Sequence, residues 1–72
     1  MTNDQYWHTH KAATELASGS FGGFAESLGK AMFRADMANL ERIAEAFPDL
    51  IALAHERIAE REARQAIATA QG

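Results

Sequence analysis

Cysteine is absent from this chain of 72 residues. Its absence excludes disulfide bonds, thiolate zinc sites and a cysteine nucleophile. Valine is absent too, and proline occurs only once, at Pro48. Because strand-forming residues are scarce and long stretches carry no helix breaker, the sequence predicts an all-α protein.

Long apolar runs are also missing. No stretch approaches the ~20 apolar residues that a membrane-spanning helix needs. The N-terminal residues lack a basic segment followed by an apolar one, so no signal peptide is expected. We therefore expect a cytoplasmic protein without a membrane contact.

Alanine, glutamate and arginine dominate what is present. The chain is 47% hydrophobic and 24% charged, with a net charge of −3, which is typical of a globular protein. Residues 1–72 are expected to form one helical domain. A chain of this length buries only about 60–65% of its unfolded surface, so its core is small. Tight helix packing or self-association as a homodimer would add stability.

The first helix is predicted over residues 4–17. Thr2, Asn3 or Asp4 can cap its start, and Gly19 suits the left-handed position beyond its end. Its broad apolar face is expected to comprise Tyr6, Trp7, His10, Ala13, Leu16 and Ala17.

The second helix has the most regular apolar spacing, and Ser20 is expected to cap it. Its apolar residues recur every three or four positions: Phe21, Phe24, Ala25, Leu28, Ala31, Met32 and Ala35. Gly22 and Gly29 lie on one flank of this helix. We interpret them as points where a neighbouring helix crosses closely, because small residues let backbones approach each other.

The apolar spacing shifts at Asp36. The next apolar set comprises Met37, Leu40, Ile43, Ala44 and Phe47. This shift predicts either a break, with Asp36 capping a third helix, or a continuous helix whose apolar face winds towards a second neighbour. We favour the break. Phe47-Pro48 marks another boundary, since proline restricts the residue before it and suits the first position of a helix.

The last helix is predicted to be long, over residues 48–69. Four residues continue the core stripe: Leu50, Ile51, Ala54 and Ile58. Beyond Ala59 most apolar side chains are alanine, which predicts either a solvated helix end or a seam against another copy. The expected fold is a compact bundle of three or four helices with a long C-terminal helix.

The residue pattern predicts neither an enzyme nor a cofactor. No serine-hydrolase, phosphate-loop or zinc-protease motif is present. On a helix His8 and His10 point about 200° apart, so they cannot share a metal ion. With His55 far along the chain, we predict no metal site, an exposed His8 and a half-buried His10 beside Trp7.

Charged residues recur at helical spacing in two parts of the sequence. Glu41, Glu45 and Asp49 recur every fourth position and would form one acidic ridge if the helices around them were continuous. The ordinary interpretation is an exposed acidic face, because a catalytic carboxylate pair needs a cleft. A basic ridge lies on the last helix: Arg57, Arg61 and Arg64.

The basic ridge and the helices joined near Asp36 resemble a DNA-binding arrangement in outline. However, the net charge of −3 argues against direct nucleic-acid binding, which calls for a basic stripe. A small dimeric DNA-binding transcriptional regulator is therefore the alternative hypothesis.

Protein recognition is the favoured hypothesis for the function. Phe33 lies off the apolar stripe, and Met37 and Trp7 are expected to be only partly covered. Aromatic and methionine side chains at a surface are the usual anchors of an interface. Phe33 either covers a neighbouring helix or anchors a partner, and both hold in an obligate dimer.

Four short segments between Gly19 and Ile51 form a recognisable pattern: Gly19-Ser20-Phe21, Ala35-Asp36, Asn39-Leu40 and Ala46-Phe47-Pro48. In this pattern the chain resembles small accessory proteins of bacteriophages and other mobile elements. The resemblance implies a short phage protein that occupies the surface of a host protein, as anti-CRISPR and other anti-defence inhibitors do. Many such inhibitors are acidic and compete for nucleic-acid-binding surfaces.

These observations lead to one prediction. We expect a phage-type accessory protein of the host cytoplasm that binds a host protein or nucleoprotein complex, and the resemblance implies an anti-CRISPR-like inhibitor. In that account, Glu41, Glu45 and Asp49 mimic phosphates, or Phe33 and Met37 anchor in a pocket. A structural or assembly role in a phage particle fits the same sequence.

Overall fold

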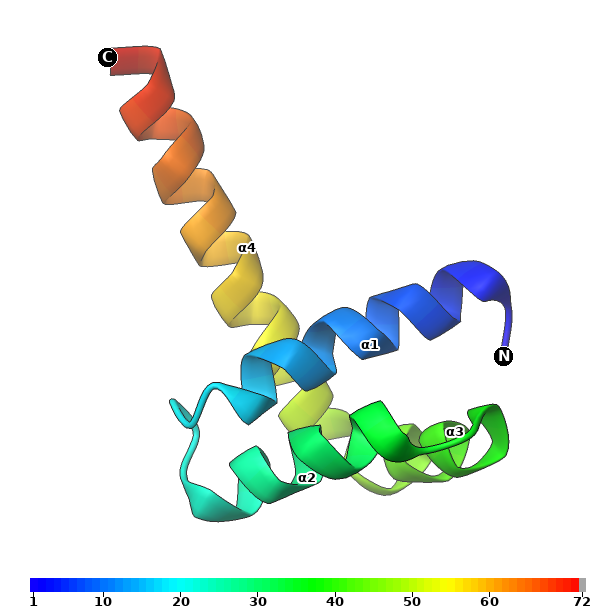
Figure 1. The fold of residues 1–72 in the computed structure, drawn as a ribbon. Helices are drawn as coiled ribbons and strands as arrows, with labels where there is room; N and C mark the ends of the chain where they lie inside the picture. Colours follow the sequence, from blue (N-terminus) through cyan, green and yellow to red (C-terminus); the bar gives the residue numbers. More distant parts are fainter. Residues whose placement is uncertain (72) are drawn as a thin grey trace.

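The computed structural model describes residues 1–71, together with the side chains of residues 1–69. Its helices are α1 (Asn3–Ala17), α2 (Gly23–Arg34), α3 (Met37–Ala46) and α4 (Pro48–Gln71) (Figure 1). The described residues form no strand. The predicted all-α bundle with a long C-terminal helix is therefore confirmed.

α1 begins with a capping box. The Gln5 backbone N–H donates to the Thr2 hydroxyl at 3.2 Å, and the Thr2 N–H donates to the Gln5 side-chain oxygen at 2.9 Å. These bonds satisfy donors that a helix start leaves unpaired. Beyond the helix end, Gly19 has a φ of +90°, a left-handed conformation that favours glycine. The predicted cap and the predicted role of Gly19 are both confirmed.

α2 begins later than predicted, and its cap is Gly22 rather than Ser20. The Ser20 hydroxyl instead accepts a hydrogen bond from the Ser18 hydroxyl at 3.1 Å. The prediction for Ser20 was wrong because the turn after α1 keeps Phe21 and Gly22 out of the helix. Gly22 is also not a crossing point, since a Cβ there would meet nothing within 4 Å.

The helix is interrupted before Asp36, which is the alternative that we favoured from the sequence. The Asn39 N–H donates to the Asp36 carboxylate at 2.8 Å, which caps α3. α3 ends before Phe47, whose φ of −128° and ψ of 53° are not helical, and Pro48 is the first residue of α4. Both predicted boundaries are confirmed, and α3 and α4 are separate helices.

α1 and α2 approach each other most closely at Gly29. A Cβ on Gly29 would lie 2.5 Å from the Ala17 nitrogen and 2.7 Å from the Ala13 carbonyl oxygen. Only a hydrogen fits there, so the predicted crossing at Gly29 is confirmed. The core beside this crossing mixes small and large residues: Ala12, Ala13, Leu16, Ala25, Met32, Leu40 and Ala54.

The predicted apolar stripes face this core only in part. On α1 the buried side contains Ala12 and Leu16, whereas the Trp7 side chain is 59% exposed. On α2, Phe24 is 64% exposed. Apolar periodicity located the helices correctly, but neighbours in so small a bundle do not cover the whole width of each stripe.

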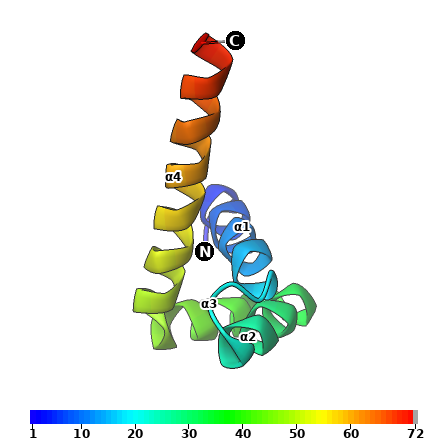
Figure 2. The same cartoon turned by 90° about the vertical axis from the view of Figure 1, so that its left-hand side faces the viewer.

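α4 has two different halves. Ala54 and Ile58 are buried, whereas every described side chain from residue 59 to residue 69 is exposed. Both views show the C-terminal half extending beyond the other helices (Figures 1 and 2). The molecule consequently measures 43 × 29 × 19 Å. None of the helices in the described part of the chain combines the length and apolar character needed to cross a membrane.

Candidate functional site

Four aromatic rings form a continuous surface across α1 and α2. We call the set Tyr6, Trp7, His10 and Phe33 the aromatic surface. Trp7 contacts Tyr6 and His10 with ring centroids 5.1 and 5.7 Å apart. His10 contacts Phe33 at 4.9 Å, and all three of these contacts are edge-to-face, a favoured arrangement.

The crossing at Gly29 explains why these rings meet. On α1, His10 lies one turn before Ala13, the residue that faces Gly29. On α2, Phe33 lies one turn after Gly29. Because the two helices run antiparallel, one turn backward on α1 meets one turn forward on α2, which brings His10 against Phe33.

The aromatic surface is ordered and also accessible. Trp7 is 59% exposed and Phe33 is 42% exposed, while Tyr6 and His10 are half-buried. The ring contacts restrict the exposed side chains, so a partner that binds them pays less rotamer entropy. Held in this way, Trp7 and Phe33 have the properties of interface anchors.

The structure answers part of the prediction for the apolar anchors. Phe33 contacts α1 through His10, so its expected role in covering a neighbouring helix is confirmed. Its exposed part is open to a partner. Met37, the first residue of α3, is 48% exposed and stays a predicted anchor.

Sequence reasoning missed that Trp7 belongs to the same surface as Phe33. The signal was the cluster of Tyr6, Trp7 and His10, which places three rings within one turn of helix. That cluster was assigned to the apolar face of the first helix, with Trp7 expected to be only partly covered. Its true position depends on which side of α1 the other helices cover.

The predicted acidic residues are not brought into one ridge. α3 ends at Ala46, so Asp49 lies on a different helix from Glu41 and Glu45. Glu41 forms an ion pair with the amino group of Met1, whereas Glu45 and Asp49 are exposed. A continuous acidic ridge required one long helix, and α3 and α4 are separate helices.

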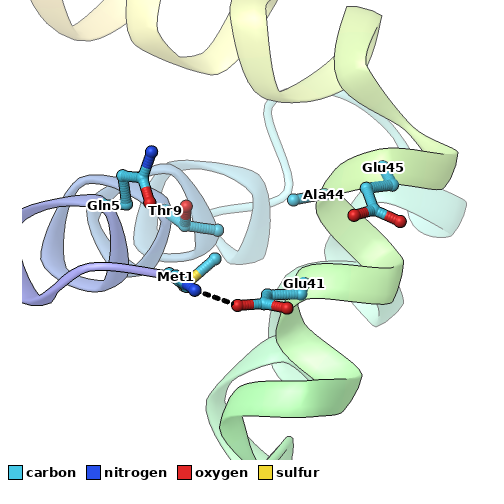
Figure 3. A pocket seen from close by; sticks show the side chains of 6 residues that line it. All are labelled: Met1, Gln5, Thr9, Glu41, Ala44 and Glu45. Carbon is cyan, nitrogen blue, oxygen red and sulfur yellow. Dashed lines mark hydrogen bonds and ion pairs between the residues drawn. The ribbon is translucent and has the colours of Figure 1, made fainter.

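Glu41 and Glu45 instead face a hollow of about 390 Å³ between α1 and α3 (Figure 3). Met1 lines it together with side chains of both helices: Gln5, Thr9, Glu41, Ala44 and Glu45. These carboxylates can hold a positive charge, as Glu41 does with Met1.

The predicted basic ridge is largely engaged within the molecule. The Arg57 guanidinium lies 5.1 Å from the centre of the Phe21 ring, a cation–π contact. Arg61 forms an ion pair with the buried Glu15, and this hydrogen bond raises the pKa of the Arg61 guanidinium. Arg64 is exposed. The three side chains therefore do not present one free basic stripe.

A pair of stacked imidazoles connects α1 to α4. The His8 and His55 rings lie 3.6 Å apart with an interplanar angle of 11°. Burial lowers the pKa of His55 below its usual 6.5, and the nearby His8 ring and Lys11 ammonium lower it further. His10 faces Phe33 instead, so the predicted divergence of His8 and His10 is confirmed.

Lys11 forms a further contact between α1 and α4. Its ammonium donates to Glu62 at 2.8 Å, and this hydrogen bond lowers the pKa of the Glu62 carboxyl. Across residues 1–71 no group of three or more potential ligands is placed to hold a metal ion.

No protein-family model matches the chain, and no curated protein or solved structure shows significant similarity to it.

Proposed function

We propose that the chain acts by binding another protein through the aromatic surface. The observation that carries this proposal is the exposure of Trp7 and Phe33 within a set of contacting rings. A small protein that leaves its only tryptophan 59% exposed forgoes burial worth about 2 kcal/mol or more. That loss is recovered if a partner covers the ring.

A protein partner fits the chain better than a nucleic acid. Aromatic rings also stack on bases, but single-stranded sites combine such rings with a positively charged groove. This chain has a net charge of −3, and two of its three ridge arginines are engaged internally. Repulsion of phosphates would oppose stacking on the aromatic surface.

The resemblance to small phage accessory proteins supports a narrower form of the proposal. The chain would be an inhibitor of a host defence nucleoprotein complex, comparable to anti-CRISPR proteins. The basic surfaces of such complexes attract an acidic protein, and the exposed Glu45 and Asp49 would add to that attraction. Glu41 contributes less, because Met1 already neutralises it.

The alternative, a small dimeric DNA-binding regulator, needs free arginines. Only Arg64 of the basic ridge is without a described intramolecular role. DNA binding by this route would weaken steeply with salt and would be lost in Arg64→Ala. The predicted homodimer is a separate proposal, based on the small core, and sedimentation velocity tests it.

The test of the main proposal is quantitative affinity capture from a bacterial host lysate. The double variant Trp7→Ser/Phe33→Ser is compared with the original chain and with Phe24→Ser. Phe24 is a matched control because it is a still more exposed phenylalanine on α2. We expect the double variant to lose captured partner by at least about tenfold, since truncating one anchor costs about 2 kcal/mol. Phe24→Ser should capture the normal amount.

Equal capture by all three proteins would contradict the proposal, provided that circular dichroism shows all three to be folded. The narrower proposal has its own readout. Expression of the chain in a bacterium with CRISPR–Cas immunity should restore plaque formation by a targeted phage, and the double variant should not. Normal inhibition by the double variant would show that the aromatic surface is not the inhibitory one.

A further inference from the structure

Thr9 is a buried residue whose hydroxyl has no hydrogen-bond partner among the described residues. It is 7% exposed, and no hydrogen bond joins its side chain to another described group. By contrast, the hydroxyls of Thr14 and Thr69 each donate to the carbonyl oxygen one helical turn back. Buried polar groups are normally paired, because removing them from water costs free energy. The Thr9 hydroxyl is therefore available to a ligand.

The hollow between α1 and α3 joins Thr9 to two carboxylates. Thr9 lines this hollow from α1, while Glu41 and Glu45 line it from α3 (Figure 3). The two glutamates are four positions apart, so they lie on the same side of α3. A volume of about 390 Å³ is at the lower end of the range for small-molecule sites. One small ligand can therefore lie between the hydroxyl and the carboxylates.

The lining of the hollow carries one uncompensated negative charge. Glu41 is paired with the Met1 ammonium group, whereas Glu45 forms no ion pair with a described residue. The other lining residues are uncharged: Gln5, Thr9 and Ala44. The hollow accordingly favours a ligand with a single positive charge. The pair of Met1 with Glu41 shows that the wall formed by α3 accommodates an ammonium group.

A metal ion suits this lining less well than an ammonium group does. Calcium and magnesium ions take about six to eight oxygen ligands, with several carboxylates among them. Only Glu45 offers a carboxylate without an ion pair here. A primary ammonium group has three N–H donors, which a carboxylate and a hydroxyl oxygen can accept.

We propose that the hollow between α1 and α3 binds a small primary amine in its protonated form. The ammonium group of the ligand donates to the Glu45 carboxylate and to the Thr9 hydroxyl oxygen. Its alkyl chain lies beside the apolar part of the lining, Ala44 and the Met1 side chain. This site is separate from the aromatic surface, which lies across α1 and α2.

The probe for this proposal is n-butylammonium chloride, titrated into the full chain labelled with ¹³C in its alanine and threonine methyl groups. We expect saturable shifts of the Thr9 and Ala44 methyl signals in NMR spectra. 1-Butanol has the same chain length without the charge, and tetramethylammonium has the charge without an N–H donor. Each should bind at least about tenfold more weakly, since a hydrogen bond to a charged group is lost.

Two variants with unchanged side-chain shape sharpen the test, and the Ala44 methyl signal reports on both. Glu45→Gln should weaken binding of n-butylammonium by about tenfold, because it removes the charge. Its control is Glu56→Gln on α4, where the exposed glutamate also lacks an ion pair with a described residue. That variant should bind normally.

Thr9→Val removes only the hydroxyl and should weaken binding about three- to tenfold. The urea unfolding midpoint of this variant should not decrease, because the Thr9 hydroxyl has no described partner to lose. A lower midpoint with unchanged affinity would assign Thr9 a structural role and would overturn the proposal.

The proposal is also overturned if n-butylammonium causes no saturable shift at Thr9 and Ala44. Equal binding of n-butylammonium and tetramethylammonium, or equal losses in Glu45→Gln and Glu56→Gln, would overturn it as well, because the binding is then a general charge effect. The double variant Trp7→Ser/Phe33→Ser should bind n-butylammonium normally, which separates this proposal from that for the aromatic surface.

Discussion

Gly29 is the residue on which the packing of α1 against α2 depends. Any Cβ there meets backbone atoms of Ala13 and Ala17, which cannot move aside as a flexible side chain can. The aromatic surface depends on the same contact, because His10 and Phe33 meet one turn away from it.

We therefore predict that Gly29→Ala destabilises the fold by about 1–3 kcal/mol, in spite of the better helix propensity of alanine. The measurement is urea unfolding followed by circular dichroism. Gly23→Ala is the matched control, since a Cβ on Gly23 meets nothing within 4 Å. That variant should be neutral or up to about 1 kcal/mol more stable. Equal stability of the two variants would show that the crossing is loose.

The local signals at single residues were predictable from the sequence. Asp36 caps α3 through its own side chain, and Pro48 starts α4 because its ring suits the first helical position. These roles depend on neighbours a few residues away. Glu15 was not predictable in this way: it is buried and pairs with Arg61, 46 positions along the chain.

At the scale of elements, polar contacts connect α1 to the middle of α4. The first contact is the stack of the His8 and His55 rings. The other two are the ion pairs of Lys11 with Glu62 and of Arg61 with Glu15. Among the described atoms, the buried Nε2 of His55 has no hydrogen-bond partner. A proton added there would bring charge to a buried site beside His8 and Lys11.

This contact predicts a pH dependence of stability. The pKa of His55 is lower in the folded chain than its usual 6.5, so unfolding takes up a proton. The stabilisation is complete above about pH 6.5 and is lost as the pH falls through the lower folded pKa. Urea unfolding midpoints measured from neutral to acidic pH should decrease accordingly.

His55→Phe provides the control for this prediction, because it keeps a flat ring against His8 and cannot be protonated. Its unfolding midpoint should decrease less over the same pH interval. An identical decrease in the variant and the original chain would assign the pH dependence to other groups.

The helices themselves were largely predictable, but their exposed sides were not. Apolar periodicity located α2 and α4, and it placed Ala25, Met32 and Ala54 correctly in the core. It also assigned Phe24 to the stripe that faces the core, although Phe24 is exposed, whereas Trp7 is partly covered as expected. Periodicity states that a face is apolar, whereas the number of neighbouring helices decides how much of that face is covered.

At the scale of the whole molecule, the proposed binding surface lies on one side of a small bundle. The aromatic surface lies across α1 and α2, and the C-terminal half of α4 extends beyond the other helices (Figures 1 and 2). A chain of 72 residues has little core to cover its wide apolar faces.

The central claim is that the aromatic surface is covered when the chain binds its partner protein. Trp7 is the only tryptophan, so 5-fluorotryptophan incorporated into the chain gives one ¹⁹F NMR signal from this surface. In the free chain the chemical shift should respond to replacing H₂O by D₂O, because the ring is 59% exposed. After addition of the unlabelled captured partner, the account predicts a displaced signal that no longer responds to the solvent. A signal that keeps its position and its full solvent response in the complex would contradict it.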